Sequence, residues 1–156
     1  MPNPWKAAAD RLHVVTIDVY APAMDLILWC HADPVPPRNE SEPDFQRRLA
    51  GKGRKQAAHV AAWLKRHLPD STKILLNPAV RAHETAEALD RQFQIVPEFL
   101  PGATATQILI AAGWWDNRHP VQIVGHQPTL GQVASLLLFG EEQNISIRKT
   151  AASDAA

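Results

Sequence analysis

Hydrophobic residues occur in two kinds of run along this chain. Short unbroken runs, typical of strands buried in a parallel sheet, alternate with longer runs in which apolar positions recur every three or four residues, as on one face of a helix. The predicted strands cover residues 12–20, 25–29, 73–76, 95–96 and 121–124. The predicted helices cover residues 53–68, 82–93, 104–112 and 128–138.

Proline and capping residues mark the ends of these elements. Pro69 ends the first helix, and Pro128 suits the first turn of the last one. Thr104 and Gln107 have the spacing of a capping box at the start of the third helix. Residues 32–45 hold four prolines among polar residues, which predicts a loop.

The alternation of strands and helices predicts one α/β domain. Its expected architecture is a three-layer α/β/α arrangement with a mostly parallel sheet, right-handed crossovers and helices on both faces. In such a sheet the ligand site lies beyond the carboxyl ends of the strands. That rule selects residues 30–33, 77–81 and 125–128.

The residues at these three places suit a phosphoryl group. One strand delivers Cys30 and His31, another delivers Arg81, and a third delivers His126. Neutral imidazole can accept a phosphoryl group, and arginine holds phosphate oxygens through two parallel hydrogen bonds. Arg81 also lies near a predicted helix N-terminus, where backbone N–H groups favour an anion. We therefore predict that His31, Arg81 and His126 line one phosphate site.

Composition narrows the classes of protein. The 156 residues suit one domain, and 16 basic residues balance 16 acidic ones, so bulk charge indicates neither nucleic acid nor a membrane as a partner. The single cysteine, Cys30, excludes an internal disulfide framework and is typical of a reducing cytoplasm. No apolar stretch approaches the ~20 residues of a membrane-spanning helix, so we expect a cytoplasmic protein. No pair of histidines has zinc-ligand spacing, and we expect neither metal nor cofactor.

Four segments combine into a recognisable pattern: Leu28-Trp29-Cys30-His31-Ala32, residues 49–57, Asn77-Pro78-Ala79-Val80-Arg81-Ala82-His83-Glu84-Thr85-Ala86, and Val124-Gly125-His126-Gln127-Pro128-Thr129-Leu130. In this order they resemble the motifs of the histidine phosphatase superfamily, and above all its short bacterial SixA-type phosphohistidine phosphatases. The resemblance covers roughly Met24 to Leu138. It implies the phosphoglycerate mutase-like form of the α/β fold.

The resemblance also implies a metal-free reaction in two steps. His31 would attack phosphorus and carry it as a phosphohistidine, which water then hydrolyses. Arg81 would hold the non-bridging oxygens, and His126 would donate a hydrogen bond to one of them. Glu98, at a place where larger relatives keep a glutamate, is the first candidate proton donor to the leaving group, and Asp33 is the second. A phosphohistidine substrate would need little such help.

Cys30 stands where the family has an arginine that contacts phosphate. A thiol cannot make a bidentate contact, and losing one such donor typically costs about 3–4 kcal/mol of transition-state stabilisation. We therefore predict weak activity, with phosphate binding outlasting turnover. A Cys30 thiolate acting as nucleophile or redox sensor is a lesser alternative. Asn77, where the family usually has serine, is a milder change.

The two ends of the chain depart from the family as well. We divide the chain into an N-terminal extension (1–23) that is non-native or poorly ordered, a phosphatase domain (24–150) and a tail (151–156). Met24 is an alternative start. The family's last strand begins near residues 145–148 and is cut short, which predicts modest stability.

Three functions remain open at this point. The first is a phosphatase that acts on a phosphorylated protein histidine or a small phosphate ester; the short chain leaves no room for a large lid, which favours a bulky substrate. The second is a degenerate relative that binds phosphorylated proteins without hydrolysing them, as Cys30 suggests. The third, a phosphoglycerate-mutase-like transferase, lacks the insertions that enclose a small substrate. The sequence predicts no oligomeric state.

Charge is distributed unevenly along the chain. Between Phe45 and Pro69 there is no acidic residue but there are seven basic ones: Arg47, Arg48, Lys52, Arg54, Lys55, Lys65 and Arg66. These residues form either an ordinary solvated helix face or a rim that steers an acidic phosphoprotein to the site. Outside the apolar stripes, Glu84 and the remaining histidines are expected at the surface.

Overall fold

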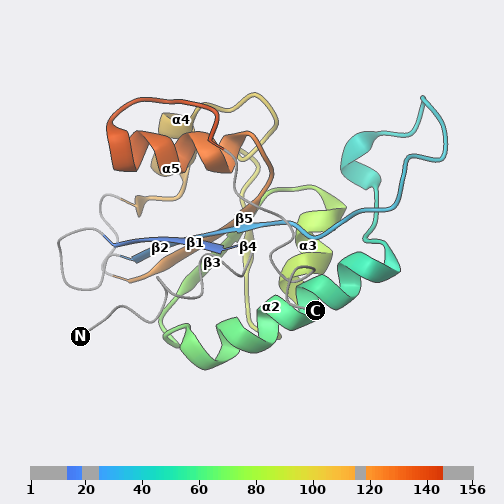
Figure 1. Cartoon of the computed structure of the whole chain (residues 1–156), viewed down its shortest axis with the longest axis horizontal. Helices are drawn as coiled ribbons and strands as arrows, with labels where there is room; N and C mark the ends of the chain where they lie inside the picture. Colours follow the sequence, from blue (N-terminus) through green and yellow to red (C-terminus); the bar gives the residue numbers. More distant parts are fainter. Residues whose placement is uncertain (1–13, 19–24, 115–118, 146–156) are drawn as a thin grey trace.

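The computed structural model describes residues 14–18, 25–114 and 119–145. Within them lies a five-stranded sheet in the order β1-β2-β5-β3-β4 (Figure 1). The strands are β1 (Val14–Asp18), β2 (Asp25–Cys30), β3 (Lys73–Leu76), β4 (Gln94–Ile95) and β5 (Val121–Gly125). β1 pairs with β2 antiparallel, and every other pairing is parallel. The predicted, mostly parallel sheet is confirmed.

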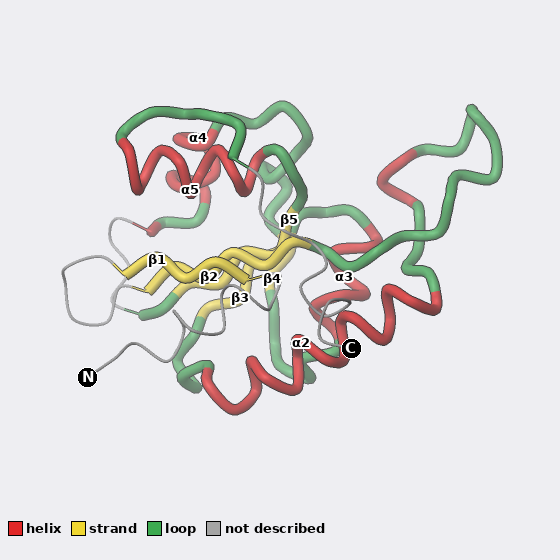
Figure 2. The backbone as a smooth tube through the Cα atoms, viewed as in Figure 1, coloured by secondary structure: helices red, strands yellow, loops and turns green. Residues whose placement is uncertain are grey.

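Helices cover both faces of this sheet. They are α2 (Gly51–His67), α3 (Val80–Glu87), α4 (Ala105–Ala111) and α5 (Thr129–Phe139), with a short 3-10 turn η1 (Asp44–Gln46) before α2. Figure 2 shows α4 and α5 on one face and α2 and α3 on the other. The three-layer α/β/α prediction is therefore confirmed, because each face of the sheet is apolar and needs its own cover.

The alternation of side chains along β2 divides the core into two clusters. Leu26 and Leu28 pack with α4 and α5, whereas Ile27 and Trp29 pack with α2 and α3. All four are at most 1% exposed. Burying side chains of this size contributes about 1.5–3 kcal/mol each before conformational entropy is subtracted. β2 is thus buried on both faces, and its carboxyl end is held firmly.

The boundaries of two helices test the sequence predictions. The capping box of α4 is present, since Thr104 Oγ1 accepts from Gln107 N–H and Gln107 Oε1 accepts from Thr104 N–H. The helix predicted over 82–93 instead runs from Val80 to Glu87, so its second half was wrong. Asp90 adopts a φ of 52°, which a right-handed helix cannot contain.

The long connection between β2 and α2 is a loop, as its prolines predict. Apart from η1, it holds a single described bridge, which pairs Pro34 with Leu49. Figure 1 shows this loop projecting beyond the sheet on the side where the parallel strands end. It therefore lies beside the edge where the site is expected.

Several predictions about the ends of the chain fall on residues outside the described part. Residues 1–13, 19–24 and 146–156 are not described, so the division at residue 23, the start at Met24 and the shortened last strand stay predictions. The strand predicted over 12–20 is confirmed for Val14–Asp18. Among the described residues no helix is long and apolar enough to cross a membrane.

Candidate active site

Loops that follow the three central strands meet at the carboxyl edge of the sheet. β2, β5 and β3 lie side by side and parallel, so the chain leaves all three at the same edge (Figure 1). Two backbone hydrogen bonds tie these exits together. His31 N–H donates to Gly125 O at 2.9 Å, and Asn77 N–H donates to Val124 O at 2.9 Å. The sheet itself therefore fixes the relative positions of the three loops.

His31 and Arg81 are in direct contact at this edge. His31 is 6% exposed and Arg81, from the first turn of α3, is 8% exposed. Arg81 Nε donates to His31 Nε2 at 3.3 Å, and His31 Nδ1 lies 2.8 Å from Ala32 O. Because a carbonyl oxygen only accepts, Nδ1 carries the proton and Nε2 keeps the lone pair. The unprotonated ring nitrogen of His31 therefore faces a guanidinium.

A buried threonine joins α3 to the loop that carries His31. Thr85 Oγ1 donates to Arg81 O at 2.6 Å and accepts from Ala32 N–H at 3.1 Å. Its side chain is fully buried. Thr85 thus couples the backbone of Arg81 to the residue after His31, which restricts how far the two side chains can move apart.

Arg81 is also paired with Asp44, a residue that the sequence did not single out. Arg81 Nη1 donates to Asp44 O and Nη2 donates to Asp44 Oδ2, both at 2.7 Å. Arg47 Nη1 donates to the other carboxylate oxygen at 2.8 Å. The hydrogen bonds from Arg47 and then Arg81 hold the pKa of Asp44 below its ordinary value of 3.8. Asp44 is therefore ionised at neutral pH and offsets part of the positive charge on Arg81.

His126 is held by neighbours from two other elements. Asn77 Nδ2 lies 3.1 Å from His126 Nδ1, and Thr129 Oγ1 lies 3.3 Å from His126 Nε2. The small hollow around this ring is lined by Asn77, Phe99, Ile108, Ile123, Gly125, His126, Thr129 and Leu130. The second imidazole thus stands in a largely apolar setting with one amide and one hydroxyl beside it.

Cys30 ends β2 inside the core. It is fully buried and belongs to the apolar cluster that β2 shares with α4 and α5. A cysteine at this place lacks the guanidinium that an arginine would bring. The structure therefore gives Cys30 the surroundings of a small hydrophobic residue.

The two candidate proton donors lie in different settings. Glu98 is exposed and lines a hollow of about 530 Å³ with Leu100, Gly102, Ala103, Gln107, Ile110 and Ala111, none of which is a predicted site residue. Asp33 Oδ2 accepts from Gln56 Nε2 at 3.0 Å and lies 3.9 Å from Lys52 Nζ. Asp33 therefore ties the loop after His31 to α2. For both residues the catalytic role stays a prediction.

Glu84 was expected at the surface, and this was wrong. Its side chain is 6% exposed and accepts from Leu49 N–H at 2.7 Å and from Arg48 Nε at 2.8 Å, with Arg54 Nη2 at 3.3 Å. Burial alone would raise the pKa of Glu84 above 4.5, but the hydrogen bonds from Leu49 and Arg48 outweigh burial and lower it. Arg48 and Arg54 lie in a segment that has no acidic residue. This was the signal that an acidic partner for them comes from another part of the chain.

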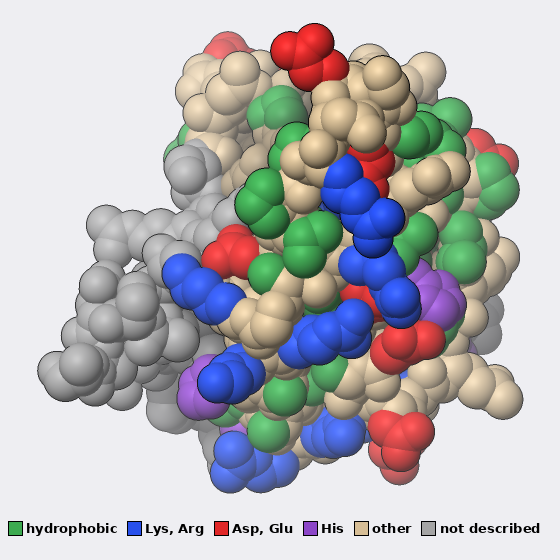
Figure 3. Space-filling model, turned by 90° about the vertical axis from the view of Figure 1, so that its right-hand side faces the viewer, with side chains coloured by type: hydrophobic (Ala, Val, Ile, Leu, Met, Phe, Trp, Pro, Cys, Tyr) green, Lys and Arg blue, Asp and Glu red, His purple; other side chains and the backbone are tan. Residues whose placement is uncertain are grey.

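The basic residues between Phe45 and Pro69 lie at the end of the loop before α2 and along α2 itself. Figure 3 looks onto this end of the molecule and shows Lys and Arg side chains gathered across it. Arg48, Lys52, Arg54 and Lys55 are exposed, whereas Arg47 is half-buried against Asp44. Lys65 and Arg66 are exposed at the opposite end of the same helix.

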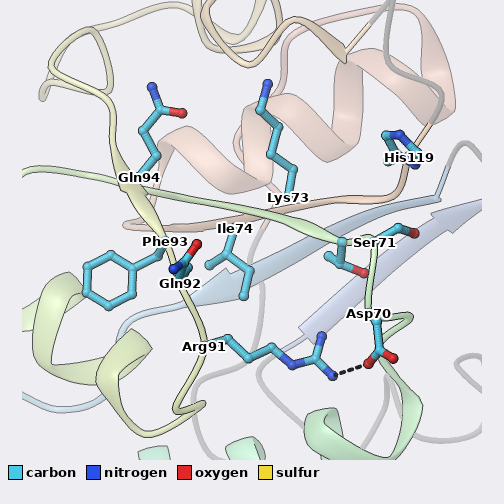
Figure 4. Close-up of a pocket in the computed structure, with 10 residues that line it drawn as sticks. Asp70, Ser71, Lys73, Ile74, Arg91, Gln92, Phe93, Gln94 and His119 are labelled. Atoms are coloured by element: carbon cyan, nitrogen blue, oxygen red, sulfur yellow. Dashed lines mark ion pairs between the residues drawn. The ribbon is translucent and has the colours of Figure 1, made fainter.

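Another hollow lies away from this edge. It has a volume of about 750 Å³ and lies at the start of β3, beside Lys73, Arg91 and His119. In Figure 4 these side chains do not converge, and Arg91 is drawn toward Asp70 at 3.9 Å. Nor do the described residues hold a group of three or more His, Cys, Asp or Glu arranged for a metal ion. At the carboxyl edge, by contrast, Arg81 contacts His31, and His126 directly follows β5, the strand next to β2.

Comparison with solved structures gives consistent neighbours. A protein of Agrobacterium tumefaciens assigned as the phosphohistidine phosphatase SixA matches with a TM-score of 0.63 and 25% identity, over 72% of this chain and 75% of that protein. A protein of Nakamurella multipartitia that is also assigned as SixA matches with a TM-score of 0.56 and 27% identity, over 67% of this chain and 60% of that protein. The protein histidine phosphatase SixA complexed with tungstate matches in fold, with a TM-score of 0.67 at 20% identity, over 80% and 83%.

Comparison with curated sequences finds uncharacterised mycobacterial proteins. ML1117 of Mycobacterium leprae is 32% identical over 106 residues, covering 65% of this chain and 63% of that protein. Rv1276c of Mycobacterium tuberculosis is 29% identical over 96 residues, covering 60% and 61%. The matched region thus spans less than two thirds of these relatives. No model of a known protein family matches the chain.

Proposed function

Because this chain is a SixA-like member of the histidine phosphatase superfamily, we propose that it is a phosphatase that passes a phosphoryl group from its substrate to His31 and then to water. The observation that carries this proposal is the contact between Arg81 Nε and His31 Nε2 at 3.3 Å. A nucleophilic lone pair and a phosphate-binding cation are adjacent there, in a setting that excludes most water. We propose the cytoplasm as its location.

In the first step, His31 Nε2 attacks phosphorus and the bond to the leaving group breaks. The electron pair of that bond stays on the leaving group, which must be protonated to depart as a neutral species. A protonated imidazole of a phosphohistidine already carries that proton; for an ester, Glu98 remains the candidate donor. Arg81 takes over phosphoryl oxygens as they approach His31, replacing its contact with the lone pair.

In the second step, water attacks the phosphohistidine and releases inorganic phosphate. The N–P bond breaks, its electron pair returns to His31 Nε2, and the water proton leaves with phosphate or solvent. His126 supports both steps by donating a hydrogen bond to a non-bridging oxygen. Because preorganised donors of this kind are typically worth about 3–4 kcal/mol each, the absence of an arginine at Cys30 predicts a slow enzyme.

A substrate of the phosphohistidine type is favoured over a small ester. Most of the loop before α2 projects beyond the sheet (Figure 1), its η1 turn holds Arg81 through Asp44, and His31 lines none of the hollows described above. The exposed basic side chains beside the site suit an acidic phosphoprotein. We propose a protein-bound phosphohistidine as the preferred substrate, with small phosphate esters turned over more slowly.

A phosphate-binding protein without turnover is the second candidate. The buried thiol of Cys30, at the place of a phosphate-binding arginine, is the observation that favours it. Both candidates predict binding of inorganic phosphate through Arg81, so binding alone does not separate them.

The deciding experiment measures p-nitrophenyl phosphate turnover and phosphate-dependent thermal shift on the wild type, His31→Ala and Cys30→Arg. The phosphatase proposal expects wild-type turnover that His31→Ala abolishes, and at least a tenfold gain in Cys30→Arg because a second guanidinium is restored. Cys30→Ser serves as the control, since it removes the thiol without adding charge. A thermal shift without turnover in the wild type would support the binding protein. No gain in a folded Cys30→Arg variant would show that Cys30 does not limit the rate.

A further inference from the structure

The side chain of Asn77 has a fixed orientation. Ala79 N–H donates to Asn77 Oδ1 at 2.7 Å, and Asn77 Nδ2 donates to Phe99 O at 2.5 Å. A backbone N–H can only donate and a backbone carbonyl can only accept, so rotating the amide by half a turn would break both bonds. Asn77 is 5% exposed, and neither group could be compensated by bulk water. The nitrogen of the amide therefore faces His126.

That orientation determines which nitrogen of His126 carries a proton. Asn77 Nδ2 lies 3.1 Å from His126 Nδ1 and approaches it as an N–H group. A ring nitrogen accepts such a hydrogen bond only when it has a free lone pair. With its lone pair on Nδ1, a neutral imidazole carries its hydrogen on Nε2. A doubly protonated ring would set one N–H against another.

We propose that Asn77 is a positioning residue that fixes His126 as the neutral tautomer with its proton on Nε2. Thr129 Oγ1, at 3.3 Å, accepts from that nitrogen in the free protein. The two imidazoles of the site then hold opposite tautomers, since His31 keeps its proton on Nδ1 beside Ala32 O. One ring supplies a lone pair and the other supplies an N–H group. The use of that N–H in turnover rests on the proposed function, whereas the tautomer does not.

The surroundings of His126 agree with a neutral ring. The hollow around it is lined by apolar side chains from α4, β5 and α5 together with Asn77 and Thr129. Among the charged side chains of neighbouring elements, Arg81 on α3 is paired with Asp44, and Glu98 is exposed beyond Phe99. The polar side chains that line this hollow beside the ring are therefore Asn77 and Thr129, which contact its two nitrogens.

The test is the ring nitrogen spectrum of His126 in uniformly ¹⁵N-labelled, full-length protein. Long-range ¹H–¹⁵N correlations distinguish the two neutral tautomers and the protonated ring, and the spectrum of His126→Gln assigns the signals. At pH 7 we expect a protonated Nε2 and an unprotonated Nδ1 in the wild type. A proton on Nδ1, or a charged ring at pH 7, would overturn the proposal.

Two variants extend the test. Asn77→Asp keeps an acceptor for Ala79 N–H but turns an oxygen toward His126, so we expect its Nδ1 to become protonated. Asn77→Ala removes the amide, so we expect a mixture of tautomers and a fall in kcat of about tenfold with KM changed less. An unchanged tautomer in both folded variants would also overturn the proposal. Where a variant does not fold, the wild-type spectrum decides, and it does so even if the protein hydrolyses nothing.

Discussion

At the scale of single residues, the charge that Arg81 could offer to a phosphate under the proposed function depends on Asp44. Arg81 uses both terminal nitrogens on Asp44, and its Nε remains directed at His31. Asp44 therefore has two opposite effects, because it orients the guanidinium and also screens its charge. Arg47 holds the second carboxylate oxygen, which keeps Asp44 in place without freeing Arg81.

We expect Asp44→Asn to bind inorganic phosphate more tightly than the wild type. The asparagine carbonyl and the unchanged backbone oxygen can still accept from Arg81, while one negative charge near the site disappears. Removing a like charge a few ångströms away in a partly hydrated site is worth about 1 kcal/mol, or roughly fivefold in Kd. Titration calorimetry at low salt measures this, and the gain should shrink as salt is added.

Asp70→Asn is the matched control, because Asp70 is exposed and pairs with Arg91 away from the site. Its phosphate affinity should equal that of the wild type. If Asp44→Asn instead weakened phosphate binding, orientation of Arg81 would outweigh screening, and the electrostatic argument would be wrong.

At the scale of secondary structure, one buried carboxylate joins three segments. Glu84 on α3 accepts from Leu49 at the end of the loop and from Arg48, and it also reaches Arg54 on α2. Arg81 lies one turn before Glu84 on the same helix. The contacts that stabilise the packing of α3 on α2 therefore also fix the helix that carries Arg81.

We expect Glu84→Gln to lower the free energy of unfolding at pH 7 by about 2 kcal/mol, the scale of hydrogen bonds lost from a buried charged group. Glu87→Gln, exposed on the same helix, should have little effect. The folded pKa of Glu84 is lowered, so its contribution is complete above the unfolded value near 4.5 and is lost as pH falls through the lower folded pKa. Denaturant unfolding at pH 7 and pH 3 should therefore show the two proteins converging in acid; a constant difference would contradict this.

The contact between α2 and the loop after His31 requires a glycine. A Cβ on Gly53 would lie 2.1 Å from Asp33 O, whereas a Cβ on Gly51 would meet nothing within 4 Å. We expect Gly53→Ala to cost about 1–3 kcal/mol in stability, the usual range for overpacking, and to lower kcat/KM by moving the backbone near His31. Gly51→Ala is the control and should unfold at an unchanged or slightly higher denaturant concentration. Equal stability and equal kcat/KM of the two variants would show that the loop at Asp33 can move to accommodate a Cβ on residue 53.

The same contacts explain how far the sequence could predict the molecule. Local sequence patterns predicted the strands and the capping box of α4. They also predicted the strand ends that are followed by His31, Arg81 and His126, because hydrophobic periodicity is a property of short segments. Asp44 and Glu84 escaped notice because their partners lie 37 and 36 residues away in the chain. The early end of α3 escaped too, since the apolar stripe continues through Leu89, which stays buried beyond the helix.

At the scale of the whole molecule, zero net charge conceals an uneven surface. Sixteen positive and sixteen negative side chains balance, yet the end shown in Figure 3 carries many Lys and Arg side chains. Arg48 and Arg54 share Glu84, and Lys52 lies 3.9 Å from Asp33, so part of this charge is compensated. Under the proposed function, the remaining positive charge would attract an acidic phosphoprotein, and fields of this kind act mainly on association rates.

Charge reversal at both ends of α2 separates steering from a mere change of net charge. Lys52→Glu with Lys55→Glu alters the end beside the site, and Lys65→Glu with Arg66→Glu makes the same change at the far end. We avoid Arg47 and Arg48 because their contacts with Asp44 and Glu84 would be lost as well.

With phosphohistidine peptides flanked by acidic residues, the first pair should lower kcat/KM about tenfold at low salt, an effect that 0.5 M salt removes. The second pair should change it little, and neither should affect peptides with uncharged flanks. An equal fall in kcat/KM in the two double variants would show that the basic residues beside the site do not steer the substrate.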